Sequence, residues 1–183
     1  MTARLPVLLL CLAPFFLRAA EPSPLMTIPP GDYAREMGDQ TLKDPAGGRH
    51  FSADVKGYVV VVIFSVPDLS QGGRQKKWAK FLAEEGATRL PRAVKFALIE
   101  DMAQSGLSGM ARDEMKKEFA PKARPLLLLD ETGAITHGFG IPRDRTQVLV
   151  YDKKGRLRHV ETANPTPESA GRVRQIAALL LAE

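Results

Sequence analysis

The sequence predicts an α/β fold with a mixed central sheet and helices on both faces. Three observations predict it: an unbroken apolar run at residues 58–64, short apolar runs that alternate with amphipathic segments, and a hairpin followed by a long C-terminal helix. Strands alternating with helices form parallel pairs, and a hairpin adds antiparallel strands. With 183 residues and 44% hydrophobic content, the chain has room for one domain of ordinary size.

The run at residues 58–64, YVVVVIF, is the clearest strand in the chain. Its seven successive apolar and mostly β-branched residues are typical of a strand covered on both faces. We therefore expect it at the centre of the sheet. Residues 41–57 contain the turn formers Asp44, Pro45, Gly47 and Gly48, which indicate a hairpin or loop leading into this strand.

Helix and strand signals alternate over the middle of the chain. Trp78, Phe81 and Leu82 recur at helical spacing and Gly86 supplies a stop, so this spacing favours core packing over an aromatic binding box. The elements expected after this helix are a strand at 94–99, a loop at 101–108, a helix at 110–119 and a strand at 126–129.

The C-terminal third predicts a turn, a hairpin and a closing helix. Residues 130–133 form the turn, and the runs 147–151 and 157–160 pair across the turn Asp152-Lys153-Lys154-Gly155. Thr166 can cap the last helix, and Pro167 suits its first turn. One face of this helix carries Val173, Ile176, Ala177 and Leu180. This order of elements is that of the thioredoxin-like fold.

The N-terminus predicts export through a secretory signal. Arg4 precedes an apolar run from Leu5 to Leu17 that is interrupted by prolines and too short to span a bilayer, as in a cleaved secretory signal. We expect the signal at residues 1–20, a linker with four prolines at residues 21–30, and the folded domain at residues 31–183. No membrane span is expected.

Cys11 is the only cysteine, and it lies inside the expected signal. Leu10 precedes it where a lipoprotein needs a small residue, and the apolar run continues past it to Leu17, so the pattern favours cleavage over lipid attachment. The processed chain is then free of thiols. Disulfide exchange and thiol peroxidase chemistry need a thiolate, which excludes both for that chain.

Residues 126–159, LLLLDETGAITHGFGIPRDRTQVLVYDKKGRLRH, resemble the C-terminal half of redoxin and peroxiredoxin domains. Together with GLSGMARDEMKKEF at 106–119 and PTPESAGRVRQIAALL at 165–180, they look like the YtfJ family of bacterial periplasmic proteins. The resemblance runs from about Gly31 to the C-terminus. It implies a thioredoxin-like fold with few cysteines, in a family without a settled function.

The redoxin resemblance also implies where the redox site of such domains would fall. A thioredoxin-type pattern laid over Phe64 puts its two cysteine positions near Leu69 and Gly72, and a peroxiredoxin pattern reaches about Gly73. The position of the cis-proline falls near Thr146. None of these is a cysteine or a proline. A hydroxyl such as that of Ser70 cannot replace a thiolate without a strong base, and no histidine lies in a triad-like motif, so we assign no catalytic residue.

A glycine pair that opens a helix is the most suggestive binding feature. Backbone N–H groups at such a helix start can bind an anion, and Arg74 lies beside the pair. Arg145 joins this site if Thr146 takes the cis-proline position. The alternative is a plain exposed turn. The candidate ligand-binding residues are Asp68, Ser70, Gln71, Gly72, Gly73, Arg74, Arg145 and Thr146.

Metal, cofactor and nucleic-acid sites are not expected. His50, His137 and His159 lack ligand spacing, and solvated turns explain the acidic pairs Glu100-Asp101 and Asp130-Glu131. Residues 1–20 carry two bases and no acid, which leaves the processed chain a net charge of +3, with bases too scattered for nucleic acid.

The sequence thus predicts an exported binding or interaction module, whose partner is an envelope protein or a small anionic ligand. The alternative is an enzyme that uses the non-thiol groups of Asp68, Ser70 and Arg145 in the cleft equivalent to the redoxin active site. A third alternative is an envelope component with a purely structural role, which a large exposed apolar patch would favour.

Overall fold

The computed structural model describes residues 41–183 except 68–71, 85, 105–107, 121–122 and 143–144. The expected signal at 1–20, the proline-rich linker at 21–30 and the start of the domain at 31 lie outside the described residues.

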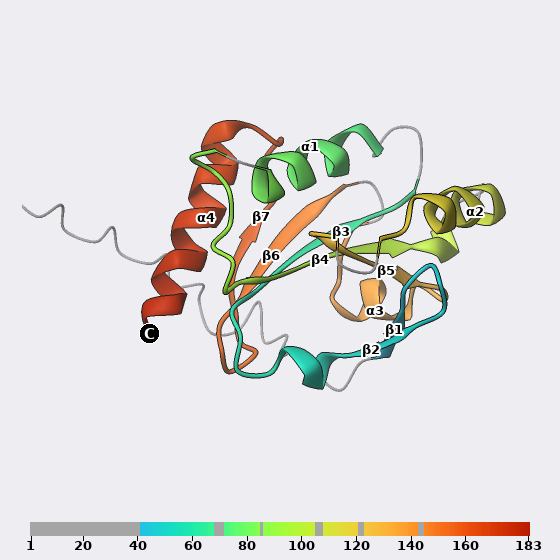
Figure 1. The fold of residues 1–183 in the computed structure, drawn as a ribbon, viewed down its shortest axis with the longest axis horizontal. Coiled ribbons are helices and arrows are strands. Elements are labelled where there is room, and N and C mark those ends of the chain that lie inside the picture. Colours follow the sequence, from blue (N-terminus) through green and yellow to red (C-terminus); the bar gives the residue numbers. More distant parts are fainter. Residues whose placement is uncertain (1–40, 68–71, 85, 105–107, 121–122, 143–144) are drawn as a thin grey trace, which may run out of the picture.

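Seven described strands form one sheet in the order β2-β1-β5-β4-β3-β6-β7 (Figure 1). Strands β3, β4 and β5 run parallel to one another, and the other neighbours pair antiparallel. The mixed sheet predicted from the sequence is therefore confirmed, with the apolar strand β3 near its centre. The strands are β1 (Thr41–Lys43), β2 (Arg49–Phe51), β3 (Val60–Ser65), β4 (Lys95–Asp101), β5 (Leu126–Asp130), β6 (Gln147–Tyr151) and β7 (Leu157–Glu161).

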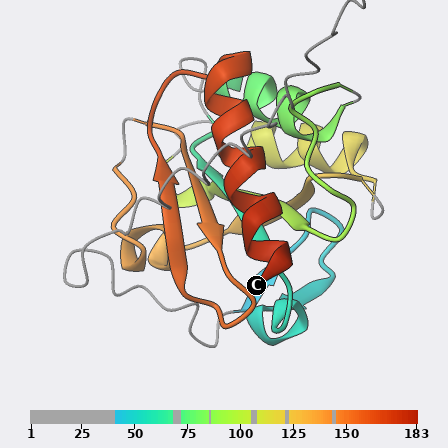
Figure 2. The same ribbon diagram turned by 90° about the vertical axis from the view of Figure 1, so that its left-hand side faces the viewer.

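The two faces of the sheet are covered by elements of different length. Two longer helices, α1 and α4, pack on one face, and α4 crosses it in front of β6 and β7 in Figure 2. The short helix α3 and the 3-10 turn η1 pack on the other face. The helical elements are η1 (Ser52–Val55), α1 (Gly72–Ala83), η2 (Met102–Gln104), α2 (Ser108–Glu118), α3 (Ala134–Gly138) and α4 (Pro167–Ala182).

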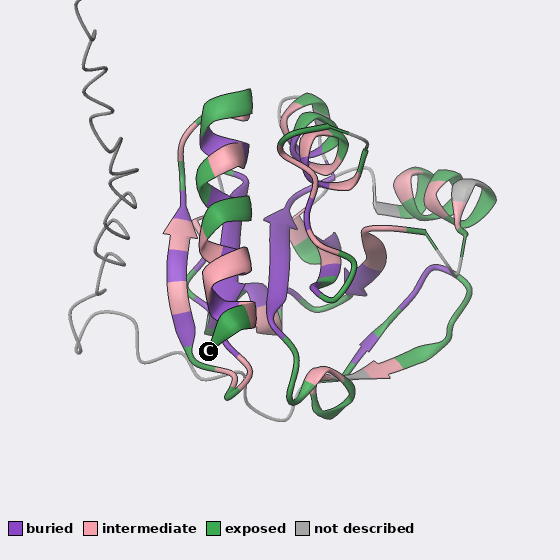
Figure 3. Ribbon diagram, turned by 60° about the vertical axis from the view of Figure 1, so that its left-hand side comes forward, coloured by how far each residue is buried: buried purple, intermediate pink, exposed green. Residues whose placement is uncertain are grey.

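Strand β3 is buried along its whole length, as its composition predicts. Side chains alternate along a strand, so Val61 and Ile63 face α1 and α4 while Val62 and Phe64 face α3. The purple strands of Figure 3 show the same burial. Trp78 of α1 is fully buried against the first of these faces, which confirms its assignment to the core.

Helix α4 begins and packs as its sequence indicates. The Thr166 hydroxyl accepts a hydrogen bond from the Ser169 N–H, and the Ser169 hydroxyl accepts one from the Thr166 N–H, which completes a capping box. Its face of Val173, Ala177 and Leu180 is fully buried.

The interpretation of the acidic pairs as solvated turns is wrong for three of the four residues. Glu100, Asp101 and Asp130 are buried, because β4 runs on to Asp101 and β5 to Asp130. Hydrogen-bond donors from the segments that follow these strands take the place of water around the carboxylates. The Asp101 Oδ1 accepts from the Ala103 N–H at 3.0 Å, and the Asp130 Oδ2 accepts from the N–H and hydroxyl of Thr136. Only Glu131 is exposed, and it pairs with Arg112.

The β6–β7 hairpin is held by one buried carboxylate. Asp152, 4% exposed, accepts hydrogen bonds from the backbone N–H groups of Lys154 and Arg156 and from the guanidinium groups of Arg156 and Arg158. Burial raises the pKa of Asp152, but the hydrogen bonds from Arg156 and Arg158 outweigh it and hold the pKa below its ordinary value of 3.8. Arg158 also pairs with Glu183, which ties the hairpin to the end of α4.

We predict that Asp152→Asn lowers the free energy of unfolding by about 2 kcal/mol at pH 7, since it removes charge-assisted hydrogen bonds from a buried group. The pKa of this carboxyl is lower in the folded than in the unfolded chain, so the ionised form stabilises the fold above the ordinary value. That stabilisation is lost as the pH falls through the folded-state pKa.

Urea denaturation of the two proteins between pH 7 and pH 3 measures the effect, and the difference between them should shrink toward the acid end. Asp113→Asn, which removes the same charge from an exposed position on α2, is the control and should have little effect. A pH-independent difference for Asp152→Asn would contradict the prediction.

Candidate functional site

The candidate site lies where the central strands end and α1 begins. In parallel strands the carboxyl ends meet at one edge of the sheet, and ligands of open α/β sheets bind there. Ser65, the last residue of β3, is in register with Glu100 of β4. Phe64 is in register with Gln147, the first residue of the antiparallel strand β6. The segment entering β6 therefore reaches the same edge.

Three polar side chains form a row across this edge, on the face that α1 covers. Two positions further from this edge, the row of side chains consists of Val148, Ile63 and Leu98, which belong to the core under α1 and α4. Because side chains alternate along a strand, Thr146, Ser65 and Glu100 continue on the same face. All three are buried, with exposed fractions of 0%, 2% and 0%. The Ser65 and Thr146 hydroxyls lie 3.4 Å apart, although 81 residues separate them in the chain.

The inward face of α1 brings further polar atoms to this end of the sheet. Gln75 and Trp78 are three residues apart on the buried stripe of the helix, with exposed fractions of 9% and 0%. Gln75 Oε1, Trp78 Nε1 and Arg74 Nε are buried and have no hydrogen-bond partner among the described residues. Each of these three atoms could form a hydrogen bond that the described residues do not supply, and a ligand could supply it.

The predicted site residues fall into two groups. Gly72, Gly73 and Arg74 form the first turn of α1, as expected from the glycine pair, and Thr146 is buried against Ser65. Arg145 is exposed beside it. The remaining predicted residues, Asp68, Ser70 and Gln71, lie outside the described residues.

The sequence did not identify three of the site's buried polar groups. Gln75 lies three residues before Trp78, and that spacing could have placed it on the inward face of the helix. Trp78 was assigned correctly to the core, but its indole N–H was not considered. Glu100 was read as the start of a turn, because the strand signal fades after Ile99.

The neighbouring pair Asp101 and Asp130 serves the fold. The two residues are in register at the ends of β4 and β5. The Ala103 N–H and the Gln104 side chain donate to the two Asp101 oxygens, and the Thr136 N–H and hydroxyl donate to Asp130 Oδ2. Gly133 has φ of 70°, and a Cβ there would lie 2.8 Å from the Asp101 Oδ1. The β5–α3 turn therefore closes tightly on Asp101, and both carboxylates are buried.

Two of the three histidines lie beside carboxylates of their own segments. His50 Nε2 lies 2.9 Å from the Asp44 Oδ2, and His159 Nε2 lies 3.8 Å from the Glu161 Oε2. Burial lowers the pKa of His159. Within the described ranges, no group of three or more His, Cys, Asp or Glu residues could hold a metal ion. In the same ranges, no helix is both long and apolar enough to cross a membrane.

Solved structures share this arrangement of sheet and helices. A secreted disulfide oxidoreductase of Mycobacterium tuberculosis, homologous to Escherichia coli DsbE, superposes with a TM-score of 0.55 at 17% identity, over 77% of this chain and 96% of that chain. The exposed lipoprotein thioredoxin Etrx1 of Streptococcus pneumoniae superposes with a TM-score of 0.55 at 16% identity, over 79% of this chain and 99% of that chain. The chain has a thioredoxin-like fold. No family model and no curated protein matches its sequence.

A third structure with this thioredoxin-like fold, the hypothetical protein SMc02350 of Sinorhizobium meliloti, gives a TM-score of 0.60 at 16% identity, over 82% of this chain and 85% of that chain. Identities this low show the fold alone. The resemblance to the YtfJ family therefore stays a prediction.

We predict a weak coupling between Ser65 and Thr146. Their 3.4 Å separation is long for two hydroxyls, so the net hydrogen bond should contribute less than about 1 kcal/mol. A double-mutant cycle with Ser65→Ala and Thr146→Val, followed by urea denaturation, measures the coupling free energy directly. Full additivity of the two variants would show that the two hydroxyls do not interact.

Proposed function

We propose that this protein is an exported binding module that keeps the ligand-facing edge of the thioredoxin-like fold and lacks the redox thiols. One observation carries the proposal. Arg74 Nε, Gln75 Oε1 and Trp78 Nε1 are buried without a hydrogen-bond partner in the described part of the chain, near the edge where the redoxin resemblance places the thiols. An unmet buried polar group costs about 1–3 kcal/mol, so a ligand that bonds to them recovers that cost.

The donors at this edge suit a small anion or an acidic segment of an envelope protein. Backbone N–H groups of the first turn of α1 point out of its N-terminus, and the helix dipole adds positive potential there. Gly73 has open space around its Cβ position, so an approaching ligand meets backbone. Arg74, Trp78 and the exposed Arg145 supply further donors. Gln75 Oε1 is an acceptor, which adds the requirement for one hydrogen-bond donor on the ligand.

The sequence supports a non-redox role. Cys11 is the only cysteine, so the chain cannot form the intramolecular disulfide on which dithiol exchange depends. If residues 1–20 are removed on export, as we propose, no thiol remains at all. Two proteins of similar fold are described as secreted and as an exposed lipoprotein, which is compatible with the exported location proposed here.

The alternative of a non-thiol enzyme receives no added support. It requires Asp68, Ser70 and Arg145 to converge, and the first two lie outside the described residues. A binding module needs only the described donors, and it is therefore the function we propose.

We predict that small anions with a hydroxyl group, such as citrate, raise the melting temperature by several degrees at saturating concentration. About 1 kcal/mol of ligand stabilisation corresponds to roughly 2–4 °C for a domain of this size. Arg74→Glu and Arg145→Glu should each abolish most of the shift by reversing a charge at the edge. Differential scanning fluorimetry at low ionic strength measures it, with an uncharged sugar as the ligand control.

Lys154→Glu is the matched control, since it makes the same charge change in the exposed β6–β7 turn at the opposite end of β6. It should keep the full shift. An equal loss of the melting-temperature shift in all three variants would show that the shift depends on net charge and not on this edge. No shift with any anion or with an acidic peptide would remove the small-ligand form of the proposal.

A further inference from the structure

We propose that the cavity on the α3 face of the sheet binds an uncharged, mostly apolar small molecule about the size of two aromatic rings. This site lies on the face opposite α1 and is separate from the edge discussed above. Each of the two proposals can therefore fail without the other.

The cavity exists because short elements cover this face. On the opposite face, α1 with 12 residues and α4 with 16 residues fill the surface of the sheet. On this face the described residues that form the cover are those of α3, with five residues, the four-residue turn η1 and the β1–β2 hairpin. The side chains of Val62, Ala97 and Leu126 stand in one row across three strands, and the small side chain of Ala97 leaves space at its centre.

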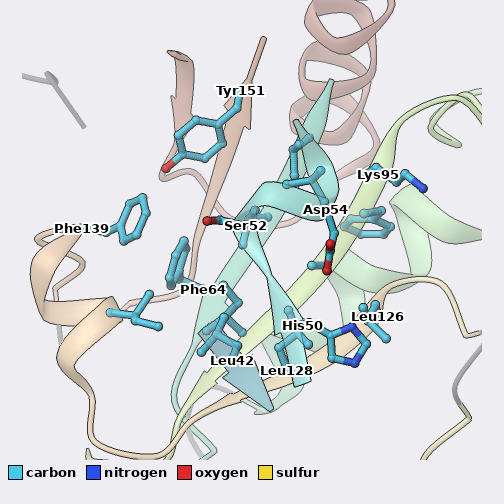
Figure 4. A pocket seen from close by; sticks show the side chains of 17 residues that line it. Leu42, His50, Ser52, Asp54, Phe64, Lys95, Leu126, Leu128, Phe139 and Tyr151 are labelled. Atoms are coloured by element: carbon cyan, nitrogen blue, oxygen red, sulfur yellow. The ribbon is translucent and has the colours of Figure 1, made fainter. Parts of the chain in front are cut away.

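The space is large enough for a ligand and is lined as ligand sites are. Its volume is about 300 Å³, about twice that of the ~150 Å³ cavity that takes up benzene. Phe64 and Phe139 contact each other with ring centroids 5.3 Å apart, and Tyr151 stands edge-on to Phe139 at 6.3 Å. Figure 4 shows these three rings on one side of the pocket. Apolar walls with a few polar groups at the mouth are typical of small-molecule sites.

The charges at the mouth indicate that the ligand is uncharged. Among the described lining residues, Asp54 and Lys95 carry opposite formal charges that sum to zero, and His50 carries a titratable ring. His50 is held by Asp44, as described above. The Lys95 ammonium lies 4.4 Å from the centroid of the Tyr58 ring and points away from the aromatic side of the pocket in Figure 4. An ionic head group would therefore lose its hydration without gaining a dedicated partner.

A matched pair of fluorescent probes tests the proposal on the purified protein. N-phenyl-1-naphthylamine is uncharged, and 8-anilinonaphthalene-1-sulfonate has the same ring system with an added sulfonate. We expect saturable binding of the neutral probe at one site per chain, with increased and blue-shifted emission. We expect about tenfold weaker binding of the sulfonate.

Ala97→Phe fills the cavity from its floor and should weaken binding of the neutral probe by about tenfold or more, while the melting temperature stays the same or rises. Ala93→Phe, at an exposed position in the turn before β4, is the matched control and should bind like the unmodified protein. Val62→Phe fills less of the space and serves as the second variant if Ala97→Phe does not fold.

Three results would overturn the proposal: no saturable binding of the neutral probe, equal affinity for both probes, or unchanged affinity in a folded cavity-filling variant. Sedimentation velocity gives a fourth. If the chain self-associates and the neutral probe reverses the association, the occupant is a second copy of this chain and the small-molecule proposal is wrong.

Discussion

Hydrogen bonding of β3 to β4 on one side and to β6 on the other fixes which strand residues reach the candidate edge and which face the cavity. The strand can lie between these neighbours because residues 59–64 are apolar on both faces and exclude water from them. Its register brings Ser65 level with Glu100 and next to Thr146. A shift of one residue would turn Ser65 to the other face and separate the three. The proposed anion site therefore depends on core packing rather than on a local loop motif.

The parts of the fold that were predictable are those with a strong local pattern. The seven apolar residues at 58–64 and the capped, amphipathic segment at 166–180 correspond to β3 and α4 within two residues. Helix α3 was missed, because Ala134–Gly138 has only five residues and two apolar positions, too few for a periodic signal. Its tight start comes from Gly133 closing on Asp101, a contact between distant residues that no local window contains.

The sequence pointed to two features of the candidate edge but not to its buried polar groups. The glycine pair marked the start of α1, and the redoxin resemblance pointed to Thr146, which the structure places beside Ser65. The expectation of solvated acids failed, since whether a carboxylate such as Glu100 is buried depends on how far the neighbouring strands extend. The unmet polar atoms of Gln75 and Trp78 could not be found from the sequence either. Hydrogen-bond satisfaction belongs to the packed structure rather than to a sequence pattern.

The different lengths of the covering elements explain why the two faces of one sheet offer different chemistry. Long helices on the α1 face pack against the apolar side chains of the sheet, and the start of α1 leaves N–H groups unpaired at the edge. Short elements on the α3 face cannot bury every apolar side chain of β3 and β4 against one another, which leaves an apolar cavity of about 300 Å³. Binding of an apolar ligand over surface that the protein's own chain leaves uncovered lowers the free energy, because it removes that surface from water. This difference between the two faces underlies the two proposals, one for a charged ligand at the edge and one for an apolar ligand in the cavity.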